Sequence, residues 1–420
     1  MSKILILGGG AAGIAAAITA AKTLGDGSQI TVLEKNPRIG KKLLATGNGR
    51  CNLDNTDISI EKYFTCDKQT AEKMLETIDN AALSKWFDSL GLFCRAEETR
   101  IYPYSNQAAD VLNLFLYWLE RLNVNILTEK KAKSISQKGQ SFCVSCESGE
   151  KFFADAVICA MGGAAAPQFG TDGFGVELAR LCGCKTEPLY PCLVPLKCEK
   201  SQVSGLSGIR VKANASLFDG ENLIHTETGE IQFTENGLSG IAIMQLSGFL
   251  SPKRRFKAPV IALDLFPSLT KDELAALILS RSKLFSNASS LDMMTGFLNR
   301  RIAQTVLKQL SFEKQNAADI DETKAQQMAN KLKNWRFSAL EPTGWQNAQT
   351  TGGGISLSEI DTKSFSLIGC NGLYFVGETL DCAGFCGGFN LHWAFGSGIC
   401  AGYNAAQYIS RISKRKNKGK

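Results

Sequence analysis

The sequence predicts an α/β fold in which one domain, built on a parallel sheet, is split by an inserted segment. The chain opens with the pattern of a strand, a glycine turn, a helix and a second strand. Residues 190–340 change to short alternating runs and then helical ones, and the last eighty residues return to a glycine-rich α/β pattern. With 420 residues, the chain has room for two or three domains and for a core that encloses a large ligand.

The first 34 residues have the pattern of a β-α-β unit. Residues 3–7 and 29–33 are short β-rich runs, and residues 11–23 between them are helix-like. Residues 8–13 (Gly-Gly-Gly-Ala-Ala-Gly) fit GxGxxG between the first strand and the helix. These glycines permit a tight turn, a close approach to pyrophosphate and close helix–strand packing. The pattern predicts a Rossmann-like dinucleotide site at the helix N-terminus.

Glu34 ends the second predicted strand. A carboxylate at this position accepts hydrogen bonds from both ribose hydroxyls and repels a 2′-phosphate. NAD and FAD both fit this half of the site, so the choice between them depends on another part of the chain.

Helical and strand patterns alternate between this unit and the insertion. Apolar residues spaced three or four apart predict helix over 71–90 and 108–122, and short strands are expected over 125–127, 141–146 and 156–159. Strand alternation would place Cys143 and Cys146 on opposite faces, so we expect no metal site at this CxxC.

The middle of the chain is expected to form an inserted domain. Residues 211–217 and 230–233 have the alternation of strands, whereas residues 271–285 and 298–332 have helical patterns. The predicted organisation is a first Rossmann-like segment (1–189), a β-rich and helical insertion (190–340), a second Rossmann-like segment (341–410) and a basic tail (411–420).

The C-terminal segment favours FAD over NAD. Residues 372–377 predict a buried strand, Glu378 follows it, and residues 388–409 predict a long helix after a glycine-rich turn. This order resembles the second flavin motif of the glutathione-reductase-like superfamily. The resemblance implies that Glu378 hydrogen-bonds the ribityl chain and that the helix N-terminus stabilises anionic reduced flavin.

Three segments together carry a more specific resemblance. Residues 40–52 (Gly-Lys-Lys-Leu-Leu-Ala-Thr-Gly-Asn-Gly-Arg-Cys-Asn), 351–355 and 373–390 resemble the BaiN/YhiN-type flavoproteins, also called aminoacetone-oxidase-family FAD-binding enzymes. The similarity covers essentially the whole chain and implies an FAD domain of the glutathione-reductase-like type. It also implies that residues 46–52 run past the pyrophosphate and isoalloxazine. The expected cofactor-binding residues are Gly8, Gly10, Ala11, Ala12, Gly13, Glu34, Lys35, Lys42, Thr46, Gly47, Gly49, Arg50, Cys51, Asn52, Ala132, Gly162, Gly377, Glu378, Gly388 and Asn390.

Two cysteines are the candidate catalytic residues. Cys51 is the favoured proton donor, because Arg50 precedes it and a nearby cation tunes the acidity of a thiol. Cys382 and Cys386 are alternative proton donors. For each of the three cysteines, the other interpretation is that the side chain only packs in the interior. Residues 170–175 also resemble a loop of fumarate-reductase-like flavoenzymes, which reduce conjugated C=C bonds. Those enzymes hold dicarboxylates with histidine and arginine, and this chain has only two histidines, so a small dicarboxylate substrate is not expected.

These observations predict an FAD-dependent oxidoreductase that takes electrons from NADH or NADPH and reduces a conjugated C=C bond. The resemblance implies a steroid-type enone or a ribosomal RNA uridine, which would become dihydrouridine. No second GxGxxG is present, so the nicotinamide donor is expected to bind transiently. Two alternatives stay open: an FAD-dependent amine oxidase that uses oxygen, and a non-enzymatic, flavin-bound RNA-binding protein.

Charge and hydropathy bear on partners and location. The chain has a net charge of +7, and its last ten residues carry six positive charges, at Arg411, Lys414, Arg415, Lys416, Lys418 and Lys420. This tail is expected to be a solvated terminus or an RNA contact. No apolar run approaches the roughly 20 residues of a membrane span, and glycines interrupt the apolar stretch near the N-terminus, which argues against a signal peptide. We therefore expect a cytoplasmic protein with reduced thiols and no membrane contact.

Overall fold

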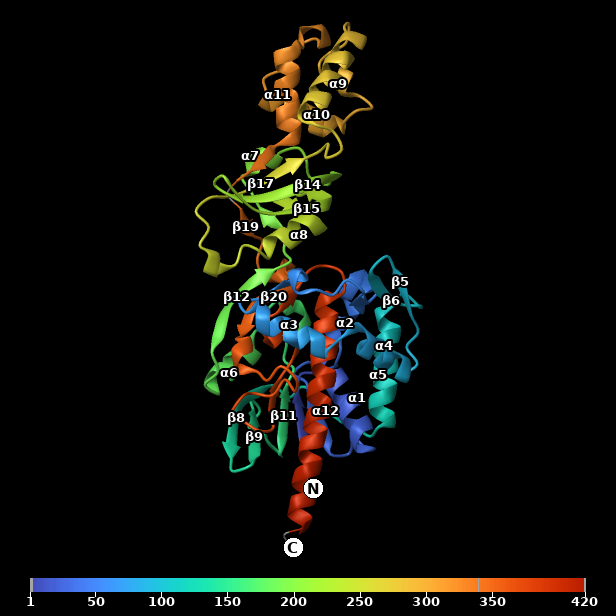
Figure 1. The fold of residues 1–420 in the computed structure, drawn as a ribbon, viewed down its shortest axis with the longest axis vertical. Helices are drawn as coiled ribbons and strands as arrows, with labels where there is room; N and C mark the ends of the chain where they lie inside the picture. The colour runs from blue at the N-terminus through green and yellow to red at the C-terminus, as the bar shows by residue number, and fades with distance from the viewer. Residues whose placement is uncertain (1–2, 339, 419–420) are drawn as a thin grey trace. The chain divides into compact units, whose positions relative to one another are not determined.

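The computed structural model describes residues 3–338 and 340–418, with side chains described up to residue 414. Its contacts divide the chain into two units, Met1–Cys192 with Trp345–Lys420, and Leu193–Gly344. The chain therefore leaves the first unit once and returns to it (Figure 1).

The first unit is built on a five-stranded parallel sheet with the order β21-β11-β1-β2-β7. Its strands are β1 (Ile4–Leu7), β2 (Ile30–Leu33), β7 (Asn125–Leu127), β11 (Ala156–Cys159) and β21 (Leu373–Phe375). All residues of β1, β11 and β21 are buried, because helices and loops cover both faces of the sheet. The chain passes from β1 to β2 on one side and later to β11 on the other, so the carboxyl end of β1 lies where the strand order reverses. Ligands of open α/β sheets bind at such a point.

Two helices pack unusually closely beside this sheet. α12 (Phe389–Lys418) runs along α1 (Ala11–Leu24), as Figure 1 shows. A Cβ atom at Gly398 would overlap the carbonyl oxygen of Ala12, and one at Gly402 would overlap that of Ala16. Glycine at these two positions therefore sets the distance between the helices.

The predicted helix over residues 71–90 is two helices. α3 (Lys68–Thr77) and α4 (Asn80–Ser89) meet at Asp79, whose side chain accepts a hydrogen bond from the Ala82 N–H. An aspartate cap begins a new helix, although the apolar spacing continues across the break. The other helices of this unit are α2 (Lys41–Leu44), α5 (Ala108–Arg121) and α6 (Phe174–Leu181).

Small antiparallel sheets complete the first unit. They consist of β8 (Ala132–Lys138), β9 (Ser141–Cys146) and β10 (Lys151–Ala154); β3 (Asp54–Asn55), β6 (Arg100–Pro103) and β5 (Cys94–Glu97); β22 (Ala383–Gly384) with β4 (Tyr63–Phe64); and β12 (Thr186–Cys192) with β20 (Thr350–Ile355). The pairing of β12 with β20 joins the two sequence segments of the unit.

The second unit contains a seven-stranded antiparallel sheet with the order β18-β17-β14-β15-β16-β13-β19. Alternate residues of β14 are buried at Ala213, Ala215 and Leu217, as the predicted strand alternation requires. The strands are β13 (Leu196–Lys197), β14 (Arg210–Asp219), β15 (Asn222–Phe233), β16 (Gly237–Ser239), β17 (Pro259–Asp264), β18 (Trp335–Phe337) and β19 (Glu341–Pro342). The helices are α7 (Lys200–Val203), α8 (Ile241–Ser247), α9 (Lys271–Leu284), α10 (Arg300–Gln309) and α11 (Glu322–Lys333).

The basic segment expected as a tail at 411–420 begins inside α12, which continues to Lys418. The side chains of Arg411 and Lys414 are exposed, and those of residues 415–420 lie outside the described part of the chain. Within the described residues, no helix is both long and apolar enough to span a membrane.

Candidate active site

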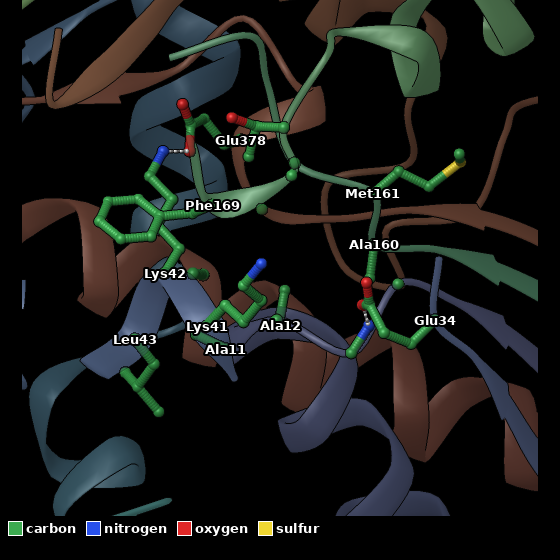
Figure 2. Close-up of a pocket in the computed structure, with 18 of the residues that line it drawn as sticks. Ala11, Ala12, Glu34, Lys41, Lys42, Leu43, Ala160, Met161, Phe169 and Glu378 are labelled. Atoms are coloured by element: carbon green, nitrogen blue, oxygen red, sulfur yellow. Dashed lines mark hydrogen bonds and ion pairs between the residues drawn. The ribbon is translucent and has the colours of Figure 1, made fainter. Parts of the chain in front are cut away.

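A cavity opens at the carboxyl edge of the parallel sheet in the first unit (Figure 2). Residues that directly follow four of the parallel strands line it: Gly8, Glu34, Ala160 and Val376.

The GxGxxG turn forms one part of the wall. Gly8 has a φ of +104°, and a Cβ there would overlap the Ala160 carbonyl oxygen, while a Cβ at Gly13 would overlap the Gly8 carbonyl oxygen. By contrast, no atom lies within 4 Å of the Cβ position of Gly10, so its backbone faces open space. No side chain caps α1, which leaves its first-turn N–H groups available to an anion. This arrangement fits a pyrophosphate.

Glu34 is 7% exposed and lies in the cavity wall. Its Oε2 accepts a hydrogen bond from the Gly9 N–H at 2.8 Å, and its Oε1 accepts from the backbone N–H of Asn36 at 2.8 Å and from Asn36 Nδ2 at 2.6 Å. A carboxylate has about four acceptor positions, so these bonds fix its orientation and leave capacity for a ribose hydroxyl.

Glu378 reaches the same cavity from the turn after β21. Its Oε2 forms an ion pair with Lys42 Nζ at 2.6 Å, which Figure 2 shows. Its Oε1 accepts hydrogen bonds from the Thr351 N–H at 2.9 Å and from Thr351 Oγ1 at 2.7 Å. The fold thus brings both acids that the sequence analysis singled out, Glu34 and Glu378, to one cavity.

The structure separates the predicted site residues into two groups. Those that line the cavity are Gly8, Gly10, Ala11, Ala12, Glu34, Lys35, Lys42, Thr46, Ala132, Gly162, Gly377, Glu378, Cys382 and Asn390. Gly13, Gly47, Gly49, Arg50, Cys51, Asn52 and Gly388 are not among the lining residues. Of the predicted loop over 46–52, only its first residue therefore lies in the described wall.

Cys51 does not have the surroundings expected of it. Its side chain is fully buried, and burial raises the pKa of its thiol to about 12. The Arg50 guanidinium binds both carboxylate oxygens of Glu97, at 2.6 and 2.7 Å, and lies over the ring of Tyr102. The neighbouring cation is therefore paired with an acid and does not lower the pKa of the thiol.

Cys382 is the predicted catalytic cysteine that lines the cavity. Its thiol is buried, which raises its pKa well above the usual value, and the Asp381 carboxylate raises it further. The thiol is therefore protonated at neutral pH. Neither His225 nor His392 lines the cavity, and the described residues contain no group of three or more side chains that suits a metal ion.

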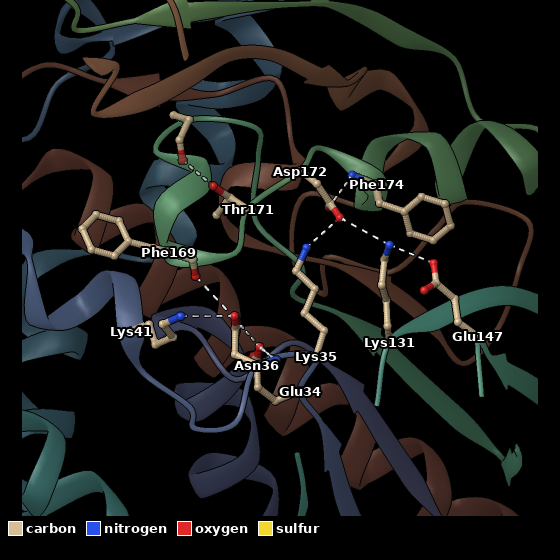
Figure 3. Close-up of polar contacts among 11 residues, drawn as sticks. Glu34, Lys35, Asn36, Lys41, Lys131, Glu147, Phe169, Thr171, Asp172 and Phe174 are labelled. Carbon is tan, nitrogen blue, oxygen red and sulfur yellow. Dashed lines mark hydrogen bonds and ion pairs between the residues drawn. The ribbon is translucent and has the colours of Figure 1, made fainter. Parts of the chain in front are cut away.

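Apart from Gly162, the sequence analysis missed a wall that residues 160–174 contribute (Figure 3). Asp172 forms an ion pair with Lys35 at 2.6 Å and lies 4.0 Å from Lys131 Nζ. Asn36 Nδ2 donates to the Phe169 carbonyl oxygen at 3.4 Å. The sequence signal for this wall lies in residues 170–175, where Gly170 and Gly173, which both adopt positive φ, mark a tightly turned loop.

The family model described as "HI0933-like protein Rossmann domain" matches residues 2–404. The chain belongs to this family. It is 34% identical to a 3-dehydro-bile acid delta(4,6)-reductase of Clostridium scindens over 410 residues, which cover 97% of this chain and 100% of the relative. It is 24% identical to a ribosomal RNA dihydrouridine synthase of Haemophilus influenzae, over 98% of this chain and 99% of that protein.

A solved flavocytochrome c3 fumarate reductase has a similar fold, with a TM-score of 0.51 at 14% identity over 97% of this chain and 78% of that one. The predicted family and the predicted fold class, a Rossmann-like domain with an insertion, are confirmed. The family places the chain among the FAD-dependent oxidoreductases.

Proposed function

We propose that this protein is a reductase that uses bound FAD and NADH or NADPH to reduce the conjugated C=C bond of a steroid-type enone. The observation that carries the proposal is the single cavity that joins the uncapped α1 N-terminus and Glu34 to the Lys42–Glu378 pair. Its lining residues come from both sequence segments of the first unit, and the bile acid reductase aligns over its whole length.

Each part of the wall has a distinct task in this proposal. The N–H groups at the start of α1 bind the pyrophosphate, and Glu34 accepts a hydrogen bond from the adenosine ribose. Glu378 accepts one from the ribityl chain, while Lys42 balances its charge. When bound and reduced, FAD supplies a hydride for the β carbon of an unsaturated carbonyl.

The α carbon of such a substrate also needs a proton. Cys382 holds one at Sγ beside the cavity, since its raised pKa keeps the thiol protonated. Cys51 lies outside the described wall, so we assign this role to Cys382.

The test is an anaerobic titration of the purified protein with NADH and NADPH, followed by addition of a 3-oxo-4-ene steroid. We expect the visible flavin band to bleach with one nicotinamide and to return on addition of the steroid, with mass spectrometry showing a saturated product. A flavin that stays oxidised with both nucleotides but bleaches with an amine, with release of hydrogen peroxide, would instead identify an amine oxidase.

A second candidate substrate is a ribosomal RNA uridine. The whole-length similarity to proteins named ribosomal RNA dihydrouridine synthases favours it, and saturation of the uridine C5=C6 bond needs the same hydride and proton. An enzyme of this kind takes the target base out of the RNA stack. Mass spectrometry of rRNA from cells with and without the gene tests it, and removal of residues 411–420 tests whether they contribute a salt-dependent RNA contact.

A further inference from the structure

Thr351 joins three segments that are far apart in the sequence. Its Oγ1 accepts hydrogen bonds from the N–H groups of Ala164 at 2.8 Å and Ala165 at 3.0 Å, and donates one to Glu378 Oε1 at 2.7 Å. Its backbone N–H donates to the same carboxylate oxygen at 2.9 Å. The residue is 1% exposed, and a hydroxyl with one donated and two accepted bonds has no further capacity.

The backbone at residue 163 is shaped for this junction. A Cβ at Gly163 would overlap Thr351 Oγ1 and would lie 2.9 Å from Glu378 Oε1. Glycine therefore lets the chain after β11 approach both side chains at once, and the Thr351 hydroxyl takes the place that a side chain would fill.

The same stretch of chain reaches the opposite end of the cavity. Its residues Gly162, Phe169, Gly170, Thr171, Asp172 and Phe174 line the wall. At its far end Asp172 pairs with Lys35, and Asn36, which holds Glu34, donates to the Phe169 carbonyl oxygen (Figure 3). The Cβ position of Gly170 lies 2.5 Å from the amide atoms of Asn36, so this end is also closely packed.

We propose that Thr351 is a positioning residue of the FAD site and anchors a strap, residues 162–174, that retains the cofactor. Its hydroxyl fixes the orientation of Glu378 and ties down one end of the strap, while the Lys35–Asp172 ion pair ties down the other. The proposal rests on the proposed FAD site. Thr351 itself takes no part in the chemistry.

Loss of the hydroxyl has a specific consequence. Glu378 keeps Lys42 and the Thr351 N–H, but the N–H groups of Ala164 and Ala165 lose their acceptor. Unpaired N–H groups at a buried site are costly, so the start of the strap moves away from residue 351. We therefore expect FAD to dissociate faster.

The experiment compares Thr351→Val, which removes the hydroxyl at nearly constant volume, with Thr351→Ser, which keeps it. Holoprotein is diluted, and the rise in flavin fluorescence gives the rate of FAD release. We expect release at least about tenfold faster for Thr351→Val, and within about threefold of wild type for Thr351→Ser. Equal release rates for the two variants, or unchanged release for both, would overturn the proposal.

A second pair of variants covers the case in which Thr351→Val does not fold. Asp172→Asn removes the far anchor and is expected to speed FAD release, with the gap to wild type closing at high salt because this ion pair is partly exposed. Glu177→Gln, which removes an ion pair with Arg180 on α6, is the control and is expected to leave release unchanged. Equal effects of Asp172→Asn and Glu177→Gln would contradict the strap. A wild-type protein that binds no FAD would instead contradict the proposed function.

Discussion

At the scale of single residues, burial separates the two candidate cysteines more clearly than sequence position does. Cys51 and Cys382 both carry protonated thiols, because burial raises the pKa of each. Of the two, only Cys382 is among the described lining residues of the cavity, which supports its proposed role as the proton donor.

Substitution of each cysteine by alanine tests this assignment. Cys382→Ala is expected to retain FAD and to lose roughly 10²-fold or more in the rate of enone reduction, the usual contribution of a general acid. Cys51→Ala is expected to keep a near-wild-type rate. Stopped-flow reoxidation of the reduced flavin by the steroid measures both, and a larger loss for Cys51→Ala would reverse the assignment.

The raised pKa of Cys51 also predicts how stability depends on pH. A thiol whose pKa is about 12 in the folded state and 9.0 when unfolded favours the folded state below pH 9, and this contribution is lost as the pH rises toward 12. By pH 10 the loss is about 1 kcal/mol. Urea unfolding at pH 8 and pH 10 is therefore expected to show the stability deficit of Cys51→Ala shrinking by about this amount. A deficit that does not change with pH would refute it.

At the scale of elements, α12 is attached to β3 by a buried polar pair. His392 is fully buried near the start of the helix, and its Nδ1 lies 2.7 Å from Asp54 Oδ1. Asp54 also accepts hydrogen bonds from the Asn55 N–H and from Asn80 Nδ2. The pair holds the start of α12, where Asn390 and Leu391 line the cavity.

Replacement of His392 tests how much this attachment contributes. His392→Phe leaves a buried carboxylate oxygen without one of its donors, so we expect the free energy of unfolding to fall by about 1–3 kcal/mol. His392→Asn, whose amide can donate to Asp54, is expected to lose less. Chemical denaturation of the two variants measures the difference, and an equal or smaller loss for His392→Phe would show that the hydrogen bond to Asp54 does not account for the stability.

At the scale of the whole molecule, every described lining residue of the cavity belongs to the first unit, although these residues come from both sequence segments. The inserted residues 193–344 therefore contribute none of the described lining residues. The pairing of β12 with β20 joins the two sequence segments that form the wall.

Hydrogen exchange with and without FAD tests this division. FAD binding stabilises what it contacts, so we expect slower exchange in residues 8–14, 160–174 and 377–394. Exchange in the buried strands of the second unit, such as β14 and β17, is expected to stay the same. Protection confined to the second unit would place the cofactor elsewhere.

The sequence by itself determined the β1–α1–β2 unit, the two glycine-rich turns and the acids Glu34 and Glu378. Local periodicity and turn chemistry encode these features, because each depends on residues close together in the chain. Periodicity and motif order predicted the fold class, and the resemblance carried by residues 40–52, 351–355 and 373–390 predicted the family; both are confirmed.

Only the tertiary structure decided which side chains meet. Contacts between residues distant in sequence include the Arg50–Glu97 pair, the junction at Thr351 and the Lys35–Asp172 ion pair. The burial of Cys51 also depends on how distant segments pack. The periodicity of a helix or strand indicates which face a residue occupies, but it does not indicate which residues pack against that face. Contacts of this kind are set by how the elements come together, and in this protein they determine which of the predicted site residues reach the cavity.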